Sequence, residues 1–238
     1  METQRAVFTV QRSDDRYCAD HGWLKTCHSF SFADYQDPSN QNWGALRVLN
    51  DDTIAPGEGF PAHPHRDMEI LTYVLDGELE HQDDMGNRGV VGPGSVQYMS
   101  AGTGVKHSEF NHSKERPLHL VQMWVLPGQR SVKPSYGQRE FTLDDRRNRW
   151  LLVASGRPGE GAPVKLMQDA SFSVARLEAA SLSHEFAPSR FGFLFVTDGT
   201  LSANDEQLKA GDAVRIAGVP SLKIAGSGEL LLWDLPPL

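Results

Sequence analysis

The chain has 238 residues, 39% of them hydrophobic and 23% charged, which is the composition of an ordinary globular protein with enough length for one large or two smaller domains. Its formal net charge of −8 argues against a general nucleic-acid binder. With only two cysteines, the chain is not a disulfide-rich scaffold.

The first residues, 1–15, lack the apolar core of a signal peptide, and no apolar run approaches the roughly 18 residues that cross a bilayer. We therefore expect a cytoplasmic protein without a membrane partner. Cys18 and Cys27 do not have C-x-x-C spacing, and the cytoplasm is a reducing compartment. We interpret both cysteines as free thiols, with a redox-sensing pair as the alternative.

Residues 21–44 are rich in aromatic and turn-forming residues, and we expect them to fold over the rest of the molecule as a lid or crossing segment. Their aromatic side chains fit two interpretations, packing in the core or lining a pocket, and we favour the core. These side chains are Trp23, Phe30, Phe32 and Tyr35.

From residue 46 onward, short apolar or alternating runs are separated by turns rich in Gly, Pro and Asp. The runs are 47–49, 68–75, 79–81, 95–99, 108–111 and 118–126 in the first half, and 150–154, 172–177, 191–196, 208–216, 222–224 and 230–235 in the second. This pattern has hardly any 3.6-residue periodicity. It predicts β-sandwiches or barrels, with less than about a fifth of the residues in helices.

The two halves repeat one order of elements. YVLDGELEHQ and GPGSVQYM in the first half correspond to LFVTDGTLSA and KAGDAVRI in the second, each a strand, an x-D-G turn, a hairpin and a glycine turn before the next strand. Between them, residues 127–145 carry two prolines and two glycines. We predict a duplicated β-domain: an N-terminal domain at 1–130, a linker at 131–145 and a C-terminal domain at 146–238.

Two short motifs, HPH at 63–65 and HSE at 107–109, carry the chemistry. Residues two apart on a strand point to the same face, so both side chains of a motif can bind the same ion. Three neutral imidazoles and a carboxylate leave about two open positions on a six-coordinate ion. This donor set predicts one divalent transition metal ion, with Fe(II) as the first choice and Mn(II), Ni(II), Co(II), Cu(II) or Zn(II) as the others.

The longer segments around these motifs resemble a known family. The spacing Gly57-x5-His63-x-His65-x3-Glu69, followed by His107-x3-Asn111, is similar to the two cupin motifs. The strings ALRVLNDDTIAPGEGFPAHPHRDMEILTYVLDGELEHQDDMGNRG and VQYMSAGTGVKHSEFN resemble the pirin branch of the bicupins, in particular its bacterial members described as quercetin 2,3-dioxygenases. The resemblance covers most of residues 20–130 and resumes at LLLWDLPP. It implies an all-β bicupin of two jelly-roll (double-stranded β-helix) barrels, with a metal at the mouth of the first.

The metal ligands that the resemblance implies are His63, His65, His107 and Glu109. The general cupin plan instead takes its acidic ligand from the first motif, where this chain has Glu69 with the strand parity of His65. We favour Glu109, because the pirin pattern takes the acid from HSE, and we give Glu69 a hydrogen bond beside the site or a solvated position. The second half has HEF at 184–186 and SLK at 221–223 in place of these motifs, so we expect it to hold no metal.

The reaction that the resemblance implies opens the heterocycle of a flavonol. The 3-hydroxyl is deprotonated and binds the ion, an electron-rich ring carbon combines with O2, and carbon monoxide leaves. Glu109 is the expected base, with a role as ligand only as the alternative. Phe60, Tyr98 and Gln122 are expected to line the pocket, or else to belong to the core. The expected partners are a flavonol or related phenol and O2, and we expect a monomer.

Two other functions stay open at this point. The first is a metal-binding, redox-responsive regulatory protein, since eukaryotic pirins are described as iron-dependent cofactors of transcription factors. The second is a different metal-dependent cupin oxygenase or isomerase that acts on a smaller phenol. The fold and the ligands do not decide between these uses, whereas the size of the pocket would.

Overall fold

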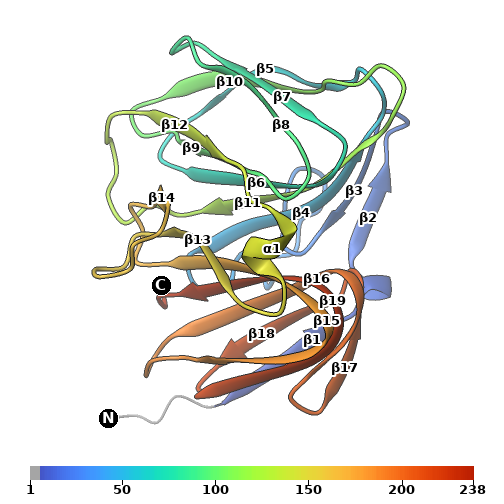
Figure 1. Cartoon of the computed structure of the whole chain (residues 1–238). Helices are drawn as coiled ribbons and strands as arrows, with labels where there is room; N and C mark the ends of the chain where they lie inside the picture. Colours follow the sequence, from blue (N-terminus) through green and yellow to red (C-terminus); the bar gives the residue numbers. More distant parts are fainter. Residues whose placement is uncertain (1–5) are drawn as a thin grey trace.

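A computed structural model of the chain describes residues 6–238, which form two β-barrels stacked one on the other (Figure 1). Among these residues the only helices are the 3-10 turn η1 (Ser13–Asp15) and the four-residue α1 (Leu143–Arg146). The predicted all-β fold class is therefore confirmed. No helix of the described residues is long and apolar enough to cross a membrane.

The N-terminal barrel consists of a seven-stranded sheet in the order β12-β9-β6-β11-β4-β3-β2 and a four-stranded sheet in the order β5-β10-β7-β8. Its strands are β2 (Tyr17–Asp20), β3 (Leu24–His28), β4 (Leu46–Ile54), β5 (Gly59–His65), β6 (Glu69–Asp76), β7 (Leu79–Asp83), β8 (Arg88–Val91), β9 (Val96–Ser100), β10 (Val105–Asn111), β11 (Leu118–Val125) and β12 (Ser135–Arg139). All pairs between these strands are antiparallel.

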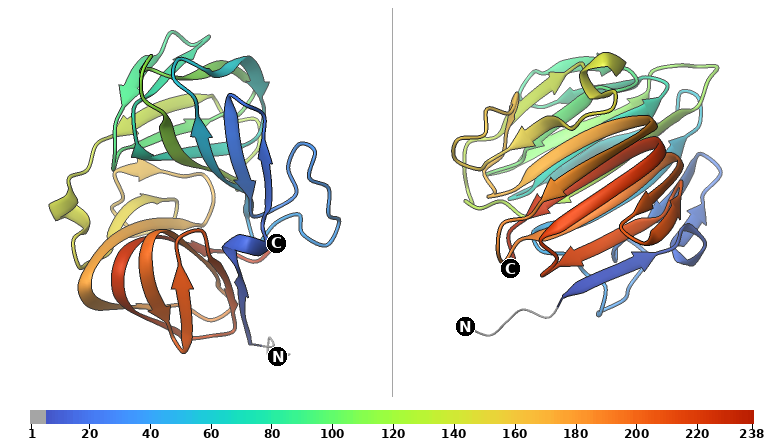
Figure 2. Two further views of the ribbon diagram at one scale, coloured as in Figure 1. Left: turned by 90° about the vertical axis from the view of Figure 1, so that its right-hand side faces the viewer. Right: turned by 60° about the horizontal axis from the view of Figure 1, so that its bottom comes forward.

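The C-terminal barrel is one eight-stranded sheet in the order β1-β18-β16-β19-β15-β13-β14, with β17 paired to β16. Its strands are β1 (Val7–Gln11), β13 (Leu151–Ser155), β14 (Val164–Lys165), β15 (Ser171–Glu185), β16 (Phe191–Ala203), β17 (Glu206–Lys209), β18 (Ala213–Ala217) and β19 (Ser221–Leu235). Figure 2 shows how the long strands β15, β16 and β19 curve around this barrel. Their register shifts between Leu177 and Ala180 and between Val196 and Asp198, and such irregularities let a strand bend.

The two barrels share a hydrophobic core, because the seven-stranded sheet packs against the sheet of the C-terminal barrel. Leu71 and Met123 of the first barrel belong to the same buried cluster as Phe172 and Trp233 of the second. Strand β6 is consequently buried on both faces. This explains why residues 68–75 are largely apolar and do not alternate.

Two strand pairings cross the domain boundaries predicted from the sequence. Strand β1 pairs with β18, so residues 7–11 join the C-terminal sheet although they lie within 1–130. Strand β12 lies within the predicted linker 131–145 and pairs with β9 at the edge of the N-terminal sheet. The division into 1–130, 131–145 and 146–238 stays a prediction. The strand order shows that β1 belongs to the C-terminal sheet and β12 to the N-terminal sheet.

The expectation of a lid at residues 21–44 needs correction. Leu24–His28 is strand β3, which lies between β4 and β2 in the seven-stranded sheet. The alternation of buried Leu24, Thr26 and His28 with the less buried residues between them is the pattern of a half-buried strand, which the surrounding aromatic and turn residues had obscured. Of the aromatic side chains, Phe30 lies in the shared core.

The interpretation of the two cysteines as free thiols is wrong for this structure. Strands β2 and β3 pair antiparallel with Cys18 directly opposite Cys27, and the two residues form a disulfide with their Cα atoms 4.1 Å apart. The sequence analysis did not predict the β2–β3 hairpin, and no other pattern in the sequence indicates that the two cysteines lie close together. The pairing follows from the register of the hairpin.

We predict that replacing Cys18 and Cys27 by Ser lowers the free energy of unfolding by about 2–3 kcal/mol, because the bond closes a loop between residues nine apart in sequence. Urea denaturation of the oxidised protein and of the double variant measures the difference. Wild type in reductant should match the variant. Two reactive thiols in native protein without reductant would contradict the assignment.

Candidate metal centre

The imidazoles of the two histidine motifs come together at the mouth of the N-terminal barrel. Strands β5 and β10 pair antiparallel with His63 opposite His107. One ring nitrogen from each of His63, His65 and His107 lies within 4.8 Å of the others. The Nε2 atoms of His63 and His107 are 3.0 Å apart. The structure thus brings the imidazole of His107 to those of His63 and His65, which precede it by more than forty residues.

This cluster has the dimensions and the protonation that a metal ion requires. Two nitrogen ligands at a right angle on an ion, each at about 2.1 Å, are about 3 Å apart, as the two Nε2 atoms are. Burial and the neighbouring imidazoles lower the pKa of His65 to about 4 and that of His107 to about 3, so both rings are neutral at pH 7. Neutral imidazole is the form that binds a metal.

Hydrogen bonds behind His63 and His107 select the tautomers in which Nε2 is free. Nδ1 of His63 donates to the carbonyl oxygen of Pro61 at 2.9 Å, because a carbonyl can only accept. Nδ1 of His107 lies 3.4 Å from Nδ1 of His81, and Nε2 of His81 lies 3.2 Å from a carboxylate oxygen of Asp83. Since that carboxylate accepts, His81 donates from Nε2 and accepts from His107 at Nδ1. Both Nε2 lone pairs are therefore available to one ion.

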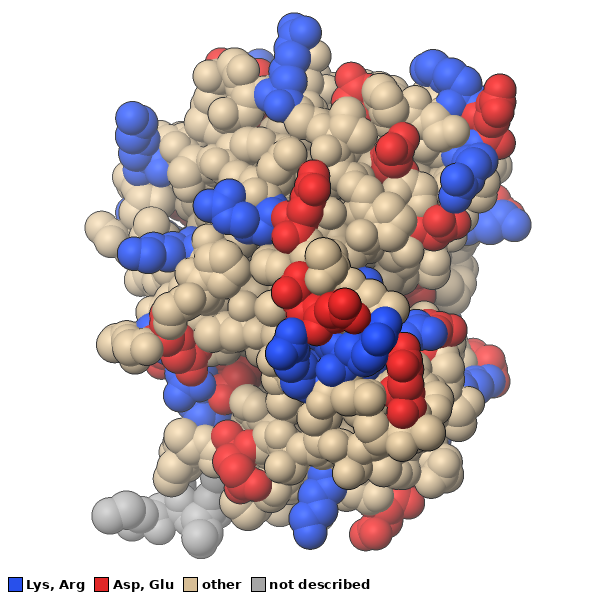
Figure 3. Space-filling view, in the orientation of Figure 1, with Lys and Arg blue, Asp and Glu red and all other residues tan. Residues whose placement is uncertain are grey.

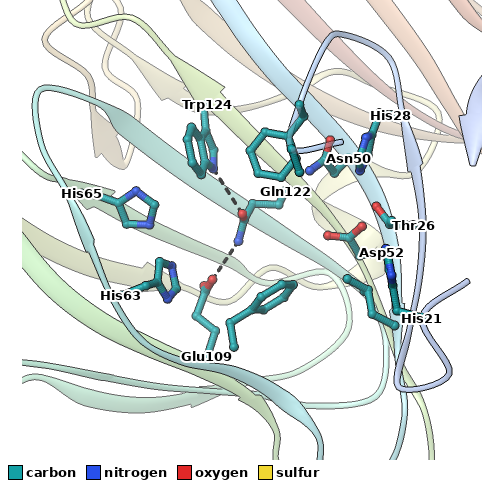
Figure 4. A pocket seen from close by; sticks show the side chains of 14 residues that line it. His21, Thr26, His28, Asn50, Asp52, His63, His65, Glu109, Gln122 and Trp124 are labelled. Carbon is teal, nitrogen blue, oxygen red and sulfur yellow. Dashed lines mark hydrogen bonds between the residues drawn. The ribbon is translucent and has the colours of Figure 1, made fainter. Parts of the chain in front are cut away.

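Glu109 is buried beside the imidazoles and is held by two amides. It is 2% exposed. Its Oε1 accepts from Nε2 of Gln97 at 2.6 Å and its Oε2 from Nε2 of Gln122 at 2.8 Å. Gln122 in turn accepts from Nε1 of Trp124 at 3.2 Å (Figure 4), which fixes the direction of its amide. A carboxylate oxygen of Glu109 lies within 4.8 Å of ring nitrogens of both His81 and His107.

The alternative acidic ligand, Glu69, faces away from this cluster. Asp67 has a positive φ of 47° between β5 and β6, so the strand parity of His65 does not continue to Glu69. The Glu69 carboxylate accepts the backbone N–H groups of Met167 at 2.7 Å and Gln168 at 3.0 Å, both from the C-terminal barrel. The side chain is fully buried between the barrels, so neither a solvated position nor a bond beside the site describes it.

A cavity of about 290 Å³ opens beside the candidate ligands. Its lining includes His63, His65 and Glu109, together with the predicted wall residues Phe60 and Gln122. Tyr98, the third predicted wall residue, does not line it. Its hydroxyl donates to Glu69 at 2.8 Å, because successive residues of β9 alternate between the site and the C-terminal barrel.

The cavity is small and its walls are largely apolar. Its volume lies at the lower end of the roughly 300–1,000 Å³ typical of small-molecule sites, so it suits one compact ligand. Leu24, Phe32, Phe60 and Trp124 supply apolar and aromatic surface. Residues 21–44 therefore do contribute to the site, through one face of β3 and through Phe32.

Three residues at the site could not be found from local sequence patterns. His81 is buried, and its ring stacks on Tyr136 of β12 with centroids 4.2 Å apart. The Tyr136 hydroxyl lies 3.5 Å from Oε1 of Gln97. These contacts depend on which strands pair, and the sequence had assigned Tyr136 to a linker.

Among the described residues, both clusters that could hold a metal lie in the N-terminal barrel. In the C-terminal barrel, Nε2 of His184 lies 3.3 Å from a carboxylate oxygen of Asp234. The same carboxylate accepts from Nε of Arg190 at 2.6 Å. An ion-pair network therefore surrounds the one histidine of the second half, and the absence of a metal from this half stays a prediction.

Comparison with known proteins gives matches to both barrels. A family model described as Pirin matches residues 10–125, and another described as the quercetinase C-terminal cupin domain matches residues 152–235. The quercetin 2,3-dioxygenase of Escherichia coli (strain K12) is 41% identical over 232 residues, covering 96% of this chain and 99% of that protein. A pirin-like protein of Caulobacter vibrioides is 42% identical over 219 residues, covering 91% and 94%.

A solved structure agrees with these matches. The crystal structure of the bacterial pirin YhhW in complex with nickel(II) from Escherichia coli has a TM-score of 0.91 and 40% sequence identity to this chain, covering 97% of this chain and 100% of that one. The predicted bicupin fold class is confirmed by the two tandem matches and by this superposition.

We predict that His63→Ala and His107→Ala each abolish stoichiometric metal binding, because each removes one of three clustered nitrogens. His184→Ala is the matched control and should keep the metal, since its ring contacts Asp234. Metal content by plasma mass spectrometry after dialysis measures the result. Loss of metal from the His184 variant would show that the second barrel carries a site.

We further predict that Asp83→Asn weakens metal affinity about 10- to 100-fold. The asparagine oxygen can still accept the backbone N–H groups of Met85 and Asn87, but its NH2 group would force His81 into the other tautomer and turn a proton of His107 toward the ion. Competition with a chelator measures the affinity. Glu80→Gln, which alters an exposed pair with His112, is the control and should have no effect.

Proposed function

This chain belongs to the pirin family, and from that membership and the site together we propose that it is a metal-dependent dioxygenase of the quercetin 2,3-dioxygenase type. It would open the heterocycle of a flavonol with O2 and release carbon monoxide. The observation that carries the proposal is the position of Glu109, a buried carboxylate between a cluster of imidazoles and an aromatic-walled cavity. That arrangement supports a role for Glu109 as the proton acceptor of a hydroxyl compound bound in the cavity.

We propose His63, His65, His107 and Glu109 as the residues that hold one divalent ion, with Fe(II) as the first choice. A bound ion would supply Lewis acidity toward the substrate oxygen and a redox-active contact for O2. Three neutral nitrogens and one carboxylate suit an ion with open coordination positions better than a closed structural zinc. The name of the related YhhW structure records nickel(II) in that protein, which supports a transition metal ion here and makes Ni(II) the second candidate.

In the proposed reaction Glu109 accepts the proton of the flavonol 3-hydroxyl at a carboxylate oxygen. Gln97 and Gln122 hold both carboxylate oxygens, so the acceptor is oriented before the substrate arrives. The Gln122 amide cannot rotate without losing the bond from Trp124. Positioning of this kind spares the reaction the cost of ordering the base in the transition state.

The deprotonated flavonol is electron-rich at a ring carbon, which combines with O2. O2 is the oxidant and the flavonol carbon skeleton is oxidised. Both oxygen atoms stay in the ring-opened ester, one ring carbon leaves as carbon monoxide, and the proton held by Glu109 returns to the product. The reaction therefore needs no further reductant, and the side chains have only to orient the flavonol and exclude water.

The regulatory alternative rests on the family alone, and the face seen in Figure 3 adds no support for it. On the face seen in Figure 3, basic and acidic side chains are interspersed. They gather beside α1, where Arg147 pairs with Asp144 and Glu178 at 3.3 and 3.5 Å. The buried cavity, by contrast, is a feature that catalysis on a small molecule uses and a docking surface does not.

We predict that Glu109→Gln retains much of the metal but loses turnover by roughly a hundredfold or more, because an amide can coordinate weakly but cannot accept a proton. Oxygen uptake with quercetin by metal-reconstituted protein, with carbon monoxide measured as product, gives the rates. Glu69→Gln is the matched control and should keep most activity, since Glu69 faces the C-terminal barrel and the amide oxygen can still accept from Tyr98 and Met167.

The reverse pattern, in which Glu69→Gln abolishes metal binding and Glu109→Gln leaves activity intact, would show that the general cupin plan applies. If metal-loaded wild type consumes no flavonol, the dioxygenase proposal fails and the regulatory alternative replaces it.

A further inference from the structure

The end of the cavity remote from the candidate ligands is lined by polar side chains of β3 and β4. These strands pair with Thr26 opposite Asp52 and His28 opposite Asn50. All four side chains face the interior of the barrel and line the cavity. Figure 4 shows them across the cavity from His63, His65 and Glu109. The cavity thus has two polar ends with apolar walls between them.

Three of these side chains have a polar atom without a hydrogen-bond partner in the described part of the chain: Asn50 Oδ1, Asp52 Oδ1 and His28 Nδ1. Asn50 and Asp52 are 3% exposed and His28 is 4% exposed. Buried polar atoms without partners are rare in folded proteins, so three on one wall point to a ligand. Two of the three are oxygen atoms, so the partner that they lack is a group with an O–H or N–H donor.

The wall carries less than one full negative charge near neutral pH, because Asp52 is about half protonated there. Burial raises the pKa of Asp52 to about 7, with the charges of Asp51 and Glu109 adding to the effect and a hydrogen bond from Thr26 opposing it. Burial lowers the pKa of His28 to about 4, so its ring is neutral. A neutral hydroxyl group, which can donate a hydrogen bond, therefore suits this wall better than a carboxylate.

We propose that Thr26, His28, Asn50 and Asp52 form a subsite for phenolic hydroxyl groups on the part of the substrate remote from its metal-binding oxygens. The inference rests on the proposed function and narrows its substrate class, from flavonols in general to polyhydroxylated flavonols. With the 3-hydroxyl at Glu109, the rings lie between Phe60 and Trp124, and a remote hydroxyl reaches the wall. Its donor satisfies the oxygen atoms that the protein leaves unpaired.

The subsite would discriminate against a ligand without the remote hydroxyl, because such a ligand leaves the polar atoms of the subsite without hydrogen-bond partners. A site built to hydrogen-bond a hydroxyl rejects an analogue without that group far more strongly than an apolar site does. Quercetin, which has hydroxyls on both outer rings, should bind at least about tenfold more tightly than 3-hydroxyflavone, which has the chelating oxygens alone.

The test measures both dissociation constants for the metal-loaded full-length protein under argon, by titration calorimetry. Asp52→Leu and Asn50→Leu keep the shape of the side chain and remove the acceptor, so each should bring the ratio of the two constants toward one, mainly by weakening quercetin. Asp52→Asn retains an acceptor and should keep most of the preference. Thr72→Val is the matched control, because Thr72 also has a buried, unpartnered oxygen but does not line the cavity.

Equal binding of the two compounds by wild type, or a preference that persists in both leucine variants, overturns the subsite. If Asp52→Leu does not fold, Asn50→Leu and the wild-type ratio still decide. Carbon monoxide release in air is measured on the same samples and tests the proposed function separately. If the protein prefers quercetin but releases no carbon monoxide, the subsite proposal stands and the dioxygenase proposal fails. If carbon monoxide is released but the leucine variants leave the ratio of the dissociation constants unchanged, the dioxygenase proposal stands and the subsite proposal fails.

Discussion

The hydrogen bonding of the buried Glu109 carboxylate is the interaction on which the candidate site depends. A carboxylate that is 2% exposed requires donors, because burying an unpaired charge is strongly unfavourable. Its donors, Gln97 and Gln122, belong to β9 and β11 of the seven-stranded sheet, whereas Glu109 and the candidate imidazoles lie on β10 and β5 of the four-stranded sheet. The carboxylate therefore joins the two sheets of the barrel at the place where the imidazoles gather. The site is complete only when both sheets have closed around it.

The C-terminal barrel contributes to this site from behind, although it supplies none of the candidate ligands. On β9, Gln97 points to Glu109 while the next residue, Tyr98, donates to Glu69 at the interface between the barrels. On β11, Gln122 points to the site and Met123 packs in the shared core. Because successive residues of a strand face opposite ways, anchoring one face fixes the direction of the other. The C-terminal barrel can thus act on the candidate site by positioning the amides of the N-terminal barrel.

Local patterns in the sequence were enough to predict the all-β fold and the cluster of imidazoles, because a period of two residues decides which side chains of a strand share a face. The same rule failed for Glu69, since the chain starts a new strand after the positive φ of Asp67. The partners that orient the candidate ligands, His81 and Gln97, were out of reach, because they depend on the order of strands in the sheets and not on spacing. Tyr136 was missed for a related reason: a segment rich in proline and glycine looked like a linker and forms an edge strand.

The polar side chains at the far end of the cavity differ from Glu109, because some of their buried atoms have no hydrogen-bond partner. Asn50 and Asp52 keep buried oxygen atoms without donors, and each such atom costs about 1–3 kcal/mol, so the strands that carry them must be held by other contacts. Strand β4 lies between β11 and β3, but β3 has only the edge strand β2 on its other side. The disulfide joins these two strands on the face opposite the polar wall, because Cys27 alternates with Thr26 and His28. Edge strands belong to the parts of a sheet that open most readily, so a covalent bond at this position helps to keep β3, and with it one side of the polar wall, in the sheet. The fold thus tolerates an unfavourable wall next to the strand pair that it has reinforced, which is the distribution expected where a local rule of folding is broken for function.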